Sequence, residues 1–161
     1  MKKHLLFNFG FNLQYAKMLT ADIPEDQMAD QPGNIPNHAA WVIGHLATTL
    51  DYLGASFGLE PACPEKWGAL VGNGSTPTSD RSQYPDKETL IAALENAHSR
   101  ISEAIASADD DLFTSDSPEG IRAYFPTIGD FAMFVCTSHA ATHLGQLSAW
   151  RRAKGLPSVM G

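Results

Sequence analysis

The side chains best suited to chemistry in this chain are three histidines, one in an early apolar stretch and two in a late one. His139 and His143 lie four residues apart in a segment whose pattern predicts a helix. At that spacing both imidazoles leave the same helix face about one turn apart, so they can chelate one divalent ion. His45, from a neighbouring helix, is the expected third ligand. Three neutral ligands leave the ion its positive charge and an open position, which is typical of catalytic rather than structural sites.

Other roles for these side chains stay open at this level. A histidine on an apolar helix face is more often a hydrogen-bonded core residue than a ligand, so packing alone is the simplest alternative. His98 is the best rival or fourth ligand, and Cys136 is a weaker one because buried cysteine usually acts as a small apolar residue. His4 is expected in solvent. Gln146 follows His143 by three residues, and it either holds that ring by a hydrogen bond or makes a packing contact.

Four segments repeat their apolar residues with the period of a helix. We expect helices over residues 4–20, 35–58, 86–108 and 127–154. Asn34 or Asn37 is the expected N-cap of the second helix. Thr127 and Asp130 resemble a capping box at the start of the fourth, and Gly155 ends it.

The helices are expected to form a four-helix bundle. Strand signals are weak, so the predicted fold is all-α, a single domain over residues 1–161. The stretch 59–85 is long enough to be a crossover between the second and third helices, anchored by Trp67. His45 and His143 lie about equally far from their helix ends, so antiparallel packing of those helices would bring them level. Parallel packing stays open.

Composition restricts the partners and the compartment. The net charge is −7, with 18 acidic and 11 basic residues, which argues against nucleic-acid binding because phosphate contact needs a basic face. Cys63 and Cys136 are the only cysteines, which favours the cytoplasm. The two lysines before the first apolar run resemble the start of a signal peptide. Asn8 and Asn12 interrupt that run, and its helical spacing favours the first bundle helix instead.

The fourth predicted helix has no charged residue between positions 131 and 150, about the length of a membrane span. Its histidines, threonines and glutamine would be costly in lipid, so we expect a helix buried on all sides in a protein that does not enter a membrane. One face would meet the bundle core and the opposite face a second subunit. The opposite face predicts a homodimer, and its residues are Phe131, Phe134, Ser138, Thr142, Gly145 and Ala149.

Three stretches together resemble the DinB/YfiT-like superfamily. They are NHAAWVIGHLA at 37–47, FPTIGD at 125–130 and HAATHLGQL at 139–147. The resemblance implies a four-helix bundle with a long crossover and a divalent ion, such as nickel or zinc, at His45, His139 and His143. Many members form dimers. Characterised relatives include transferases and isomerases that use bacterial low-molecular-weight thiols.

The leading functional hypothesis is therefore a metal-dependent thiol S-transferase acting on a small molecule. Nickel or zinc is the expected ion, with manganese, cobalt and iron as alternatives. His38 and Tyr52 are candidates for proton transfer. Two other hypotheses stay open, namely a metal-dependent hydrolase and a non-catalytic metal-binding or sensor module.

Overall fold

Apolar residues at helical spacing form the inner faces of four long helices in the computed structural model, which describes residues 2–160. They are α1 (Lys2–Thr20), α2 (Ala39–Gly54), α4 (Lys87–Ser107) and α8 (Ala140–Ala153). No strand forms within residues 2–160, which confirms the all-α prediction. The extent of the domain, 1–161, stays a prediction, and its two terminal residues lie outside the described part.

Shorter helical segments connect the long ones. Before α2 lie two 3-10 turns, Glu25–Gln27 and Pro32–Asn34. The crossover after α2 contains the 3-10 turn Ala55–Phe57, α3 (Trp67–Val71) and the 3-10 turn Arg81–Gln83. Between α4 and α8 lie α5 (Asp110–Thr114), α6 (Glu119–Arg122), α7 (Ile128–Met133) and a π-helical segment, Phe134–His139.

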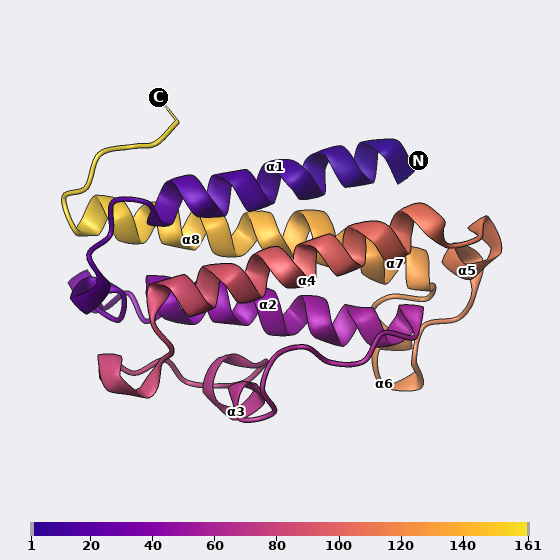
Figure 1. Cartoon of the computed structure of the whole chain (residues 1–161), viewed down its shortest axis with the longest axis horizontal. Helices are drawn as coiled ribbons and strands as arrows, with labels where there is room; N and C mark the ends of the chain where they lie inside the picture. Colours follow the sequence, from indigo (N-terminus) through magenta and orange to yellow (C-terminus); the bar gives the residue numbers. More distant parts are fainter. Residues whose placement is uncertain (1, 161) are drawn as a thin grey trace.

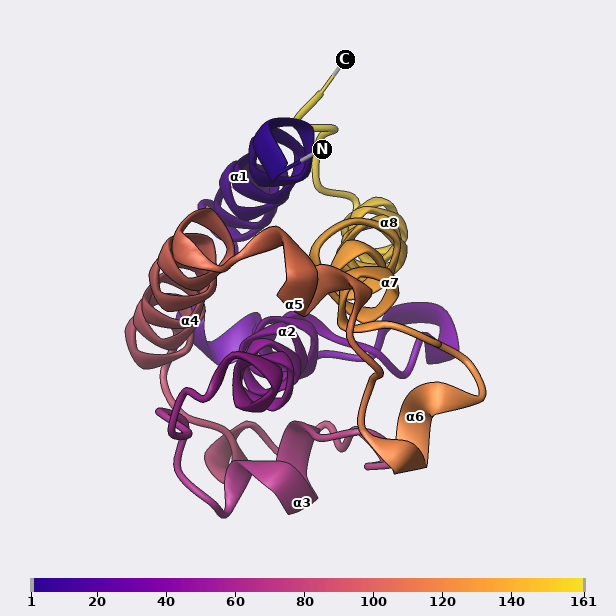
Figure 2. The ribbon, with the colours of Figure 1, turned by 90° about the vertical axis from the view of Figure 1, so that its right-hand side faces the viewer.

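The four long helices surround the core, as the view along the bundle in Figure 2 shows. The chain between α2 and α4 returns along the whole bundle, so these two helices run parallel, whereas α8 runs antiparallel to α2 (Figure 1). In this antiparallel arrangement His45 and His143, which lie about equally far from their helix ends, come level with each other, as considered from the sequence. The crossover is held to the bundle by Trp67, which is 2% exposed, and by the buried Val71.

Helix α2 begins later than expected, and neither predicted asparagine is its N-cap. His38 has an extended backbone, and its ring Nδ1 accepts a hydrogen bond from the backbone N–H of Trp41. Asn34 instead adopts a left-handed conformation, with φ of 60°, inside a 3-10 turn. Pro36 lies just outside the helix. The predicted helix end at residue 58 also differs from the structure. The α-helix ends at Gly54, a 3-10 turn follows over Ala55–Phe57, and Gly58 then has a φ of 72°.

The third predicted helix matches α4 closely. The side chain of Asp86 accepts from the backbone N–H of Thr89, which makes it the N-cap. The spacing of its apolar residues places one stripe in the core, as predicted. This stripe consists of Leu90, Leu94, Ala97, Ile101 and Ile105.

The fourth predicted helix has the expected start but is not one continuous α-helix. Thr127 and Asp130 form the predicted capping box. The π-helical segment then separates α7 from α8, and a turn of this kind inserts an extra residue. The extra residue rotates the side chains before it relative to those after it. Phe131 is buried and Phe134 is 37% exposed, and both line one pocket. The homodimer stays a prediction.

The face of the fourth helix that was expected to meet a second subunit is uncovered in the single chain, so burial of this helix on all sides stays a prediction. Ser138, Thr142 and Gly145 are exposed, because no other helix of the bundle covers that side. Over residues 2–160, no helix combines the length and apolar character that crossing a membrane requires. The end of α8 is fixed to the end of α1 by buried Arg151, which pairs with Asp22.

Candidate metal centre

The bundle brings the rings of His45, His139 and His143 together between α2 and the fourth helix. One ligand-capable nitrogen from each ring lies within 4.8 Å of the others. Nε2 of His45 and Nε2 of His139 are 3.1 Å apart. Two nitrogens on one tetrahedral zinc ion, each bonded at about 2.05 Å, would be about 3.3 Å apart. The donor set therefore fits a divalent ion with little rearrangement.

The tautomer of His45 is fixed by the crossover. Its Nδ1 lies 2.7 Å from the backbone oxygen of Val71, and a carbonyl can only accept, so Nδ1 carries the proton and Nε2 presents a lone pair. The ring also stacks on Trp41, one helical turn earlier, with centroids 4.5 Å apart. Gly44 permits the close approach of α3, since a Cβ there would lie 3.1 Å from the side chain of Val71.

Two side-chain amides orient the ring of His143 through hydrogen bonds. Its Nδ1 donates to Oε1 of Gln146 at 3.0 Å, and the same oxygen accepts from Nδ2 of Asn37 at 2.9 Å. Oε1 therefore receives two donors, which orients the amide and leaves Nε2 of His143 free for a ligand. The structure selects the hydrogen-bonding role for Gln146 from the two roles considered above.

His139 is placed by the π-helical segment that it ends. A π-helical turn leaves backbone carbonyls without their usual partners, and Asn12 of α1 supplies one. Its Nδ2 donates to the oxygen of Cys136 at 3.0 Å and lies 3.5 Å from that of Thr137. Asn12 thus joins α1 to the turn that carries His139.

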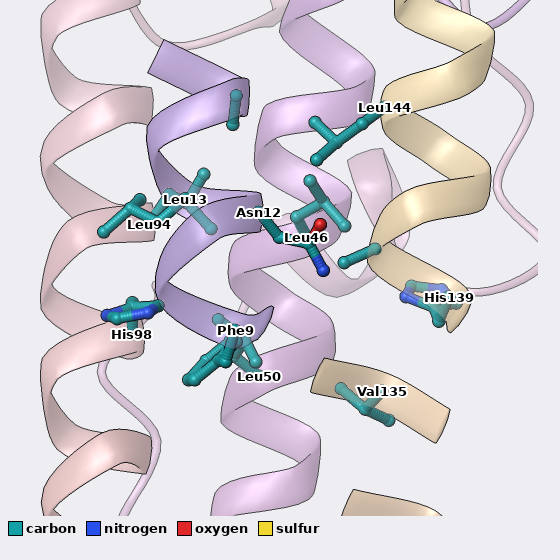
Figure 3. Close-up of a pocket in the computed structure, with 12 residues that line it drawn as sticks. Phe9, Asn12, Leu13, Leu46, Leu50, Leu94, His98, Val135, His139 and Leu144 are labelled. Carbon is teal, nitrogen blue, oxygen red and sulfur yellow. The ribbon is translucent and has the colours of Figure 1, made fainter. Parts of the chain in front are cut away.

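A small cavity lies beneath this turn, among all four long helices. Its volume is about 20 Å³, and His139, Asn12 and His98 lie in its wall (Figure 3). Within the described chain, neither Nδ1 of His139 nor Nε2 of His98 has a protein hydrogen-bond partner. A cavity of this volume is large enough for one water molecule.

Burial keeps the three imidazoles neutral. Loss of hydration, together with the smaller effect of the neighbouring rings, lowers the pKa of His139 to about 3 and that of His143 to about 4. Burial also lowers the pKa of His45. Neutral imidazole is the form that binds a metal ion, so the site is ready to bind at neutral pH.

A larger pocket opens beside two of the ligands. Its volume is about 640 Å³, and His45 and His139 lie at one side of it. Among residues 2–160, its lining includes no aspartate, glutamate, lysine or arginine side chain. The other lining residues are Thr48, Thr49, Tyr52, Gly68, Gly72, Asn73, Ile121, Phe125, Phe131, Phe134 and Val135.

The two candidates for proton transfer lie in different places. Tyr52 lines the pocket and is more than half exposed. His38 is buried away from the pocket lining, with Nδ1 capping α2 and Nε2 3.0 Å from the backbone oxygen of Thr78. Both of its ring nitrogens serve the fold, and burial lowers its pKa to about 4. A catalytic role for Tyr52 stays a prediction.

The alternative ligands lie outside the cluster. His98 faces the small cavity and packs on Phe9, with ring centroids 4.0 Å apart. Cys136 is fully buried, and burial raises the pKa of its thiol to about 12. His4 is exposed, as expected. Both cysteines of the described chain are free thiols.

Sequence reasoning missed Asn12, Asn37 and Val71 as partners of the site. Asn12 did carry a signal, since it interrupts the apolar stripe of the first helix beside Leu13. A polar residue on a core-facing stripe indicates a buried hydrogen bond. Val71 acts through its backbone oxygen, which leaves no trace in the residue type.

Comparison with protein families gives one match. The family model of the DinB superfamily matches residues 9–147, a stretch that includes all three clustered histidines and Asn12. None of the curated proteins matches the chain.

Proposed function

The chain belongs to the DinB superfamily, and from this membership and its three convergent imidazoles we propose a metal-dependent enzyme that transfers a low-molecular-weight thiol to an electrophilic small molecule. The observation that carries the proposal is that His45 and His139 both line the 640 Å³ pocket as well as the ligand cluster. A metal held there would have an open position on a space of the size that small-molecule sites have.

The protein's own residues would hold the ion and keep the site net positive. His45, His139 and His143 would bind it through neutral nitrogens, so its charge would not be cancelled. When bound, a divalent ion supplies a positive charge that favours the thiolate form of a thiol at its open position. Nickel or zinc suits three imidazoles, and availability decides between such ions in cells.

The chemistry of the pocket favours a thiol nucleophile over water. A thiol has a pKa near 8.5, so a nearby positive charge is enough to ionise it at neutral pH. Hydrolysis by a metal-bound water is often assisted by a histidine or carboxylate that acts as general base, and within the described chain no carboxylate lines this pocket. The site therefore supports the hydrolase hypothesis less well than the transferase hypothesis.

The proposed transfer conserves atoms and charge. The thiol loses its proton to solvent, and the sulfur forms a bond to an electrophilic carbon of the second substrate. The leaving group departs from that carbon with the bonding electron pair. Tyr52 lies at the pocket with its hydroxyl available to donate a hydrogen bond to the leaving group. Low-molecular-weight thiols stay reduced in the cytoplasm, which is where this activity would operate.

The decisive experiment combines metal analysis with an activity assay on protein purified without a histidine tag. Zinc, nickel, manganese and cobalt are loaded separately, and each form is tested for conjugation of cysteine, glutathione and coenzyme A to a chromogenic electrophile. We expect one ion per chain and a metal-dependent rate with at least one thiol. His143→Ala should lose both the ion and the rate. His4→Ala removes an exposed histidine and should lose neither.

Two outcomes contradict the transferase. One ion per chain without any metal-dependent conjugation would favour the non-catalytic sensor module. A metal-dependent hydrolysis of esters or amides without conjugation would favour the hydrolase. Absence of bound metal in the parent protein after loading would contradict the transferase, the hydrolase and the sensor-module hypotheses.

We also propose that the protein is a homodimer. Phe7, Phe11 and Met18 are exposed on α1, and the exposed side of α8 carries small uncharged residues. Helices α1 and α8 lie side by side (Figures 1 and 2), so one partner surface can cover both. Light scattering at high micromolar concentration should give a dimer mass, and Phe11→Glu should reduce it. A monomer mass for the parent protein would contradict this proposal.

A further inference from the structure

We propose that the 640 Å³ pocket selects an uncharged electrophile with a flat, aromatic or similarly apolar body. The inference rests on the proposed function, because it names the substrate class for that reaction. It is carried by two features of the pocket lining, namely a continuous series of aromatic rings and the absence of charge.

The aromatic series begins at a candidate metal ligand. The ring of Phe134 lies 5.7 Å from that of His139, between centroids, and Phe125 lies 4.7 Å from Phe134. Phe125 is 5.4 Å from Phe131, which meets Tyr52 edge to face at 5.8 Å. The rings therefore extend within one pocket lining from a candidate ligand, His139, to the largely exposed ring of Tyr52. Surfaces of this kind bind flat apolar groups by offset stacking and edge contacts.

Part of this series is not used by the fold. The core already buries Phe131, which is 4% exposed, whereas Phe134 is 37% exposed and Tyr52 is 54% exposed. Exposed aromatic side chains gathered at a pocket indicate a surface that a ligand covers. The π-helical segment brings Phe134 to this position, and such turns often occur at functional sites.

The polar groups of the pocket are few, and two are already engaged. The hydroxyl of Thr48 donates to the backbone oxygen of Gly44 at 3.2 Å, and that of Thr49 donates to the oxygen of His45 at 2.8 Å. In the described chain, no lysine or arginine lines the pocket. A charged substituent buried against the aromatic rings would lose its hydration without gaining an opposite charge. The reacting centre of the substrate thus faces the histidines, and the remainder is uncharged.

The test varies the group attached to a constant metal-chelating group, so that the contribution of the aromatic ring to affinity is measured alone. Zinc-loaded protein is titrated by calorimetry with acetohydroxamic, benzohydroxamic and 4-carboxybenzohydroxamic acids, which share one chelating head. Burial of a phenyl ring should make benzohydroxamic acid at least about tenfold tighter than acetohydroxamic acid. The 4-carboxylate should abolish most of that gain.

Variants assign the gain to the aromatic series. Phe125→Ala should weaken benzohydroxamic acid about tenfold and leave acetohydroxamic acid unchanged. Tyr52→Ala provides a second variant, because its largely exposed side chain contributes little to folding. Phe7→Ala removes an exposed ring on α1, outside the pocket lining, and should change no affinity.

Failure of this inference is distinguishable from failure of the proposed function. Equal affinities for the benzoyl and 4-carboxybenzoyl ligands would overturn the inference, as would failure of all three ligands to bind. An equal effect of Phe125→Ala on all three ligands would also overturn it. If the expected order holds but no thiol is conjugated, the pocket assignment stands and the transferase is wrong. If thiols are conjugated but the order is lost, the reverse is true.

Discussion

Replacing Asn12 by alanine tests whether α1 holds the π-helical segment and, through it, a metal ligand. Nδ2 of Asn12 is 3.0 Å from the oxygen of Cys136, and no other long helix reaches this turn with an amide in the described chain. Its loss leaves a carbonyl without its donor, which costs about 1–3 kcal/mol. Alanine regains about 0.5 kcal/mol through its higher helix propensity. The expected net loss of unfolding free energy is therefore about 0.5–2.5 kcal/mol.

The matched control is Asn8→Ala, one turn earlier on the same helix. Asn8 is exposed, and its Nδ2 donates only within α1, to the oxygen of His4 at 2.9 Å. It shares the gain in helix propensity but not the contact with the π-helical segment. We expect its unfolding free energy to change by less than about 0.5 kcal/mol.

Two measurements decide the outcome. Urea unfolding with a chelator present reports the stability of the metal-free protein, and competition with a chromogenic chelator reports the zinc dissociation constant. Displacing a residue that orients a ligand typically weakens metal binding about tenfold, which is the effect expected for Asn12→Ala alone. If Asn12→Ala and Asn8→Ala give equal stabilities and equal zinc affinities, the role assigned to Asn12 is refuted.

Three further predictions follow from neighbouring contacts. Gly44→Ala places a Cβ 3.1 Å from the side chain of Val71 and should weaken zinc binding about tenfold. Gly10→Ala, where no atom lies within 4 Å of the added Cβ, should leave zinc binding unchanged. Competition with a chromogenic chelator measures both affinities. Gln146→Leu removes the acceptor of one ligand ring and should weaken zinc binding about 10–100-fold in the same assay, whereas Gln14→Leu on the exposed side of α1 should have no effect. Burial lowers the pKa of His38 to about 4 in the folded state, so the unfolded chain takes up the proton first as the pH falls. The stability due to neutral His38 is complete above pH 6.5 and falls by up to roughly 3 kcal/mol towards pH 4. Urea midpoints between pH 7.5 and 4.5 should fall less steeply in His38→Gln than in the parent protein, and parallel slopes would count against this assignment.

The long helices were predictable because their signals are local. The apolar stripe of α4 and the cap at Asp86 both lie within one segment, so periodicity and capping rules locate them. The start of α2 was not located, because the two cap candidates in the sequence, Asn34 and Asn37, precede the residue that caps the helix, His38. The choice among Asn34, Asn37 and His38 depends on backbone angles that tertiary contacts fix.

The ligand cluster was predictable for the same reason, and its surroundings were not. The spacing of His139 and His143 follows from helix geometry, and antiparallel packing brings His45 level with them. The π-helical segment is contacted by Asn12, which lies 124 residues earlier in the chain than Cys136. The aromatic pocket likewise combines Tyr52 of α2 with rings from the last third of the chain. Contacts over such separations leave no periodic signal in a sequence.

If the three histidines bind an ion as proposed, the distance in sequence between them would link metal supply to the lifetime of the protein. His45 and His139 are 94 residues apart, and the carbonyl that orients His45 lies 26 residues beyond it in the crossover. A complete set of donors exists only when α2, the crossover, the π-helical segment and α8 are docked, so an ion would bind the native chain and not partly unfolded forms. At a free concentration of 100 times its dissociation constant, it would add about 2.7 kcal/mol to global stability. Cells short of the ion would then degrade this protein faster, because proteases act on its opened forms.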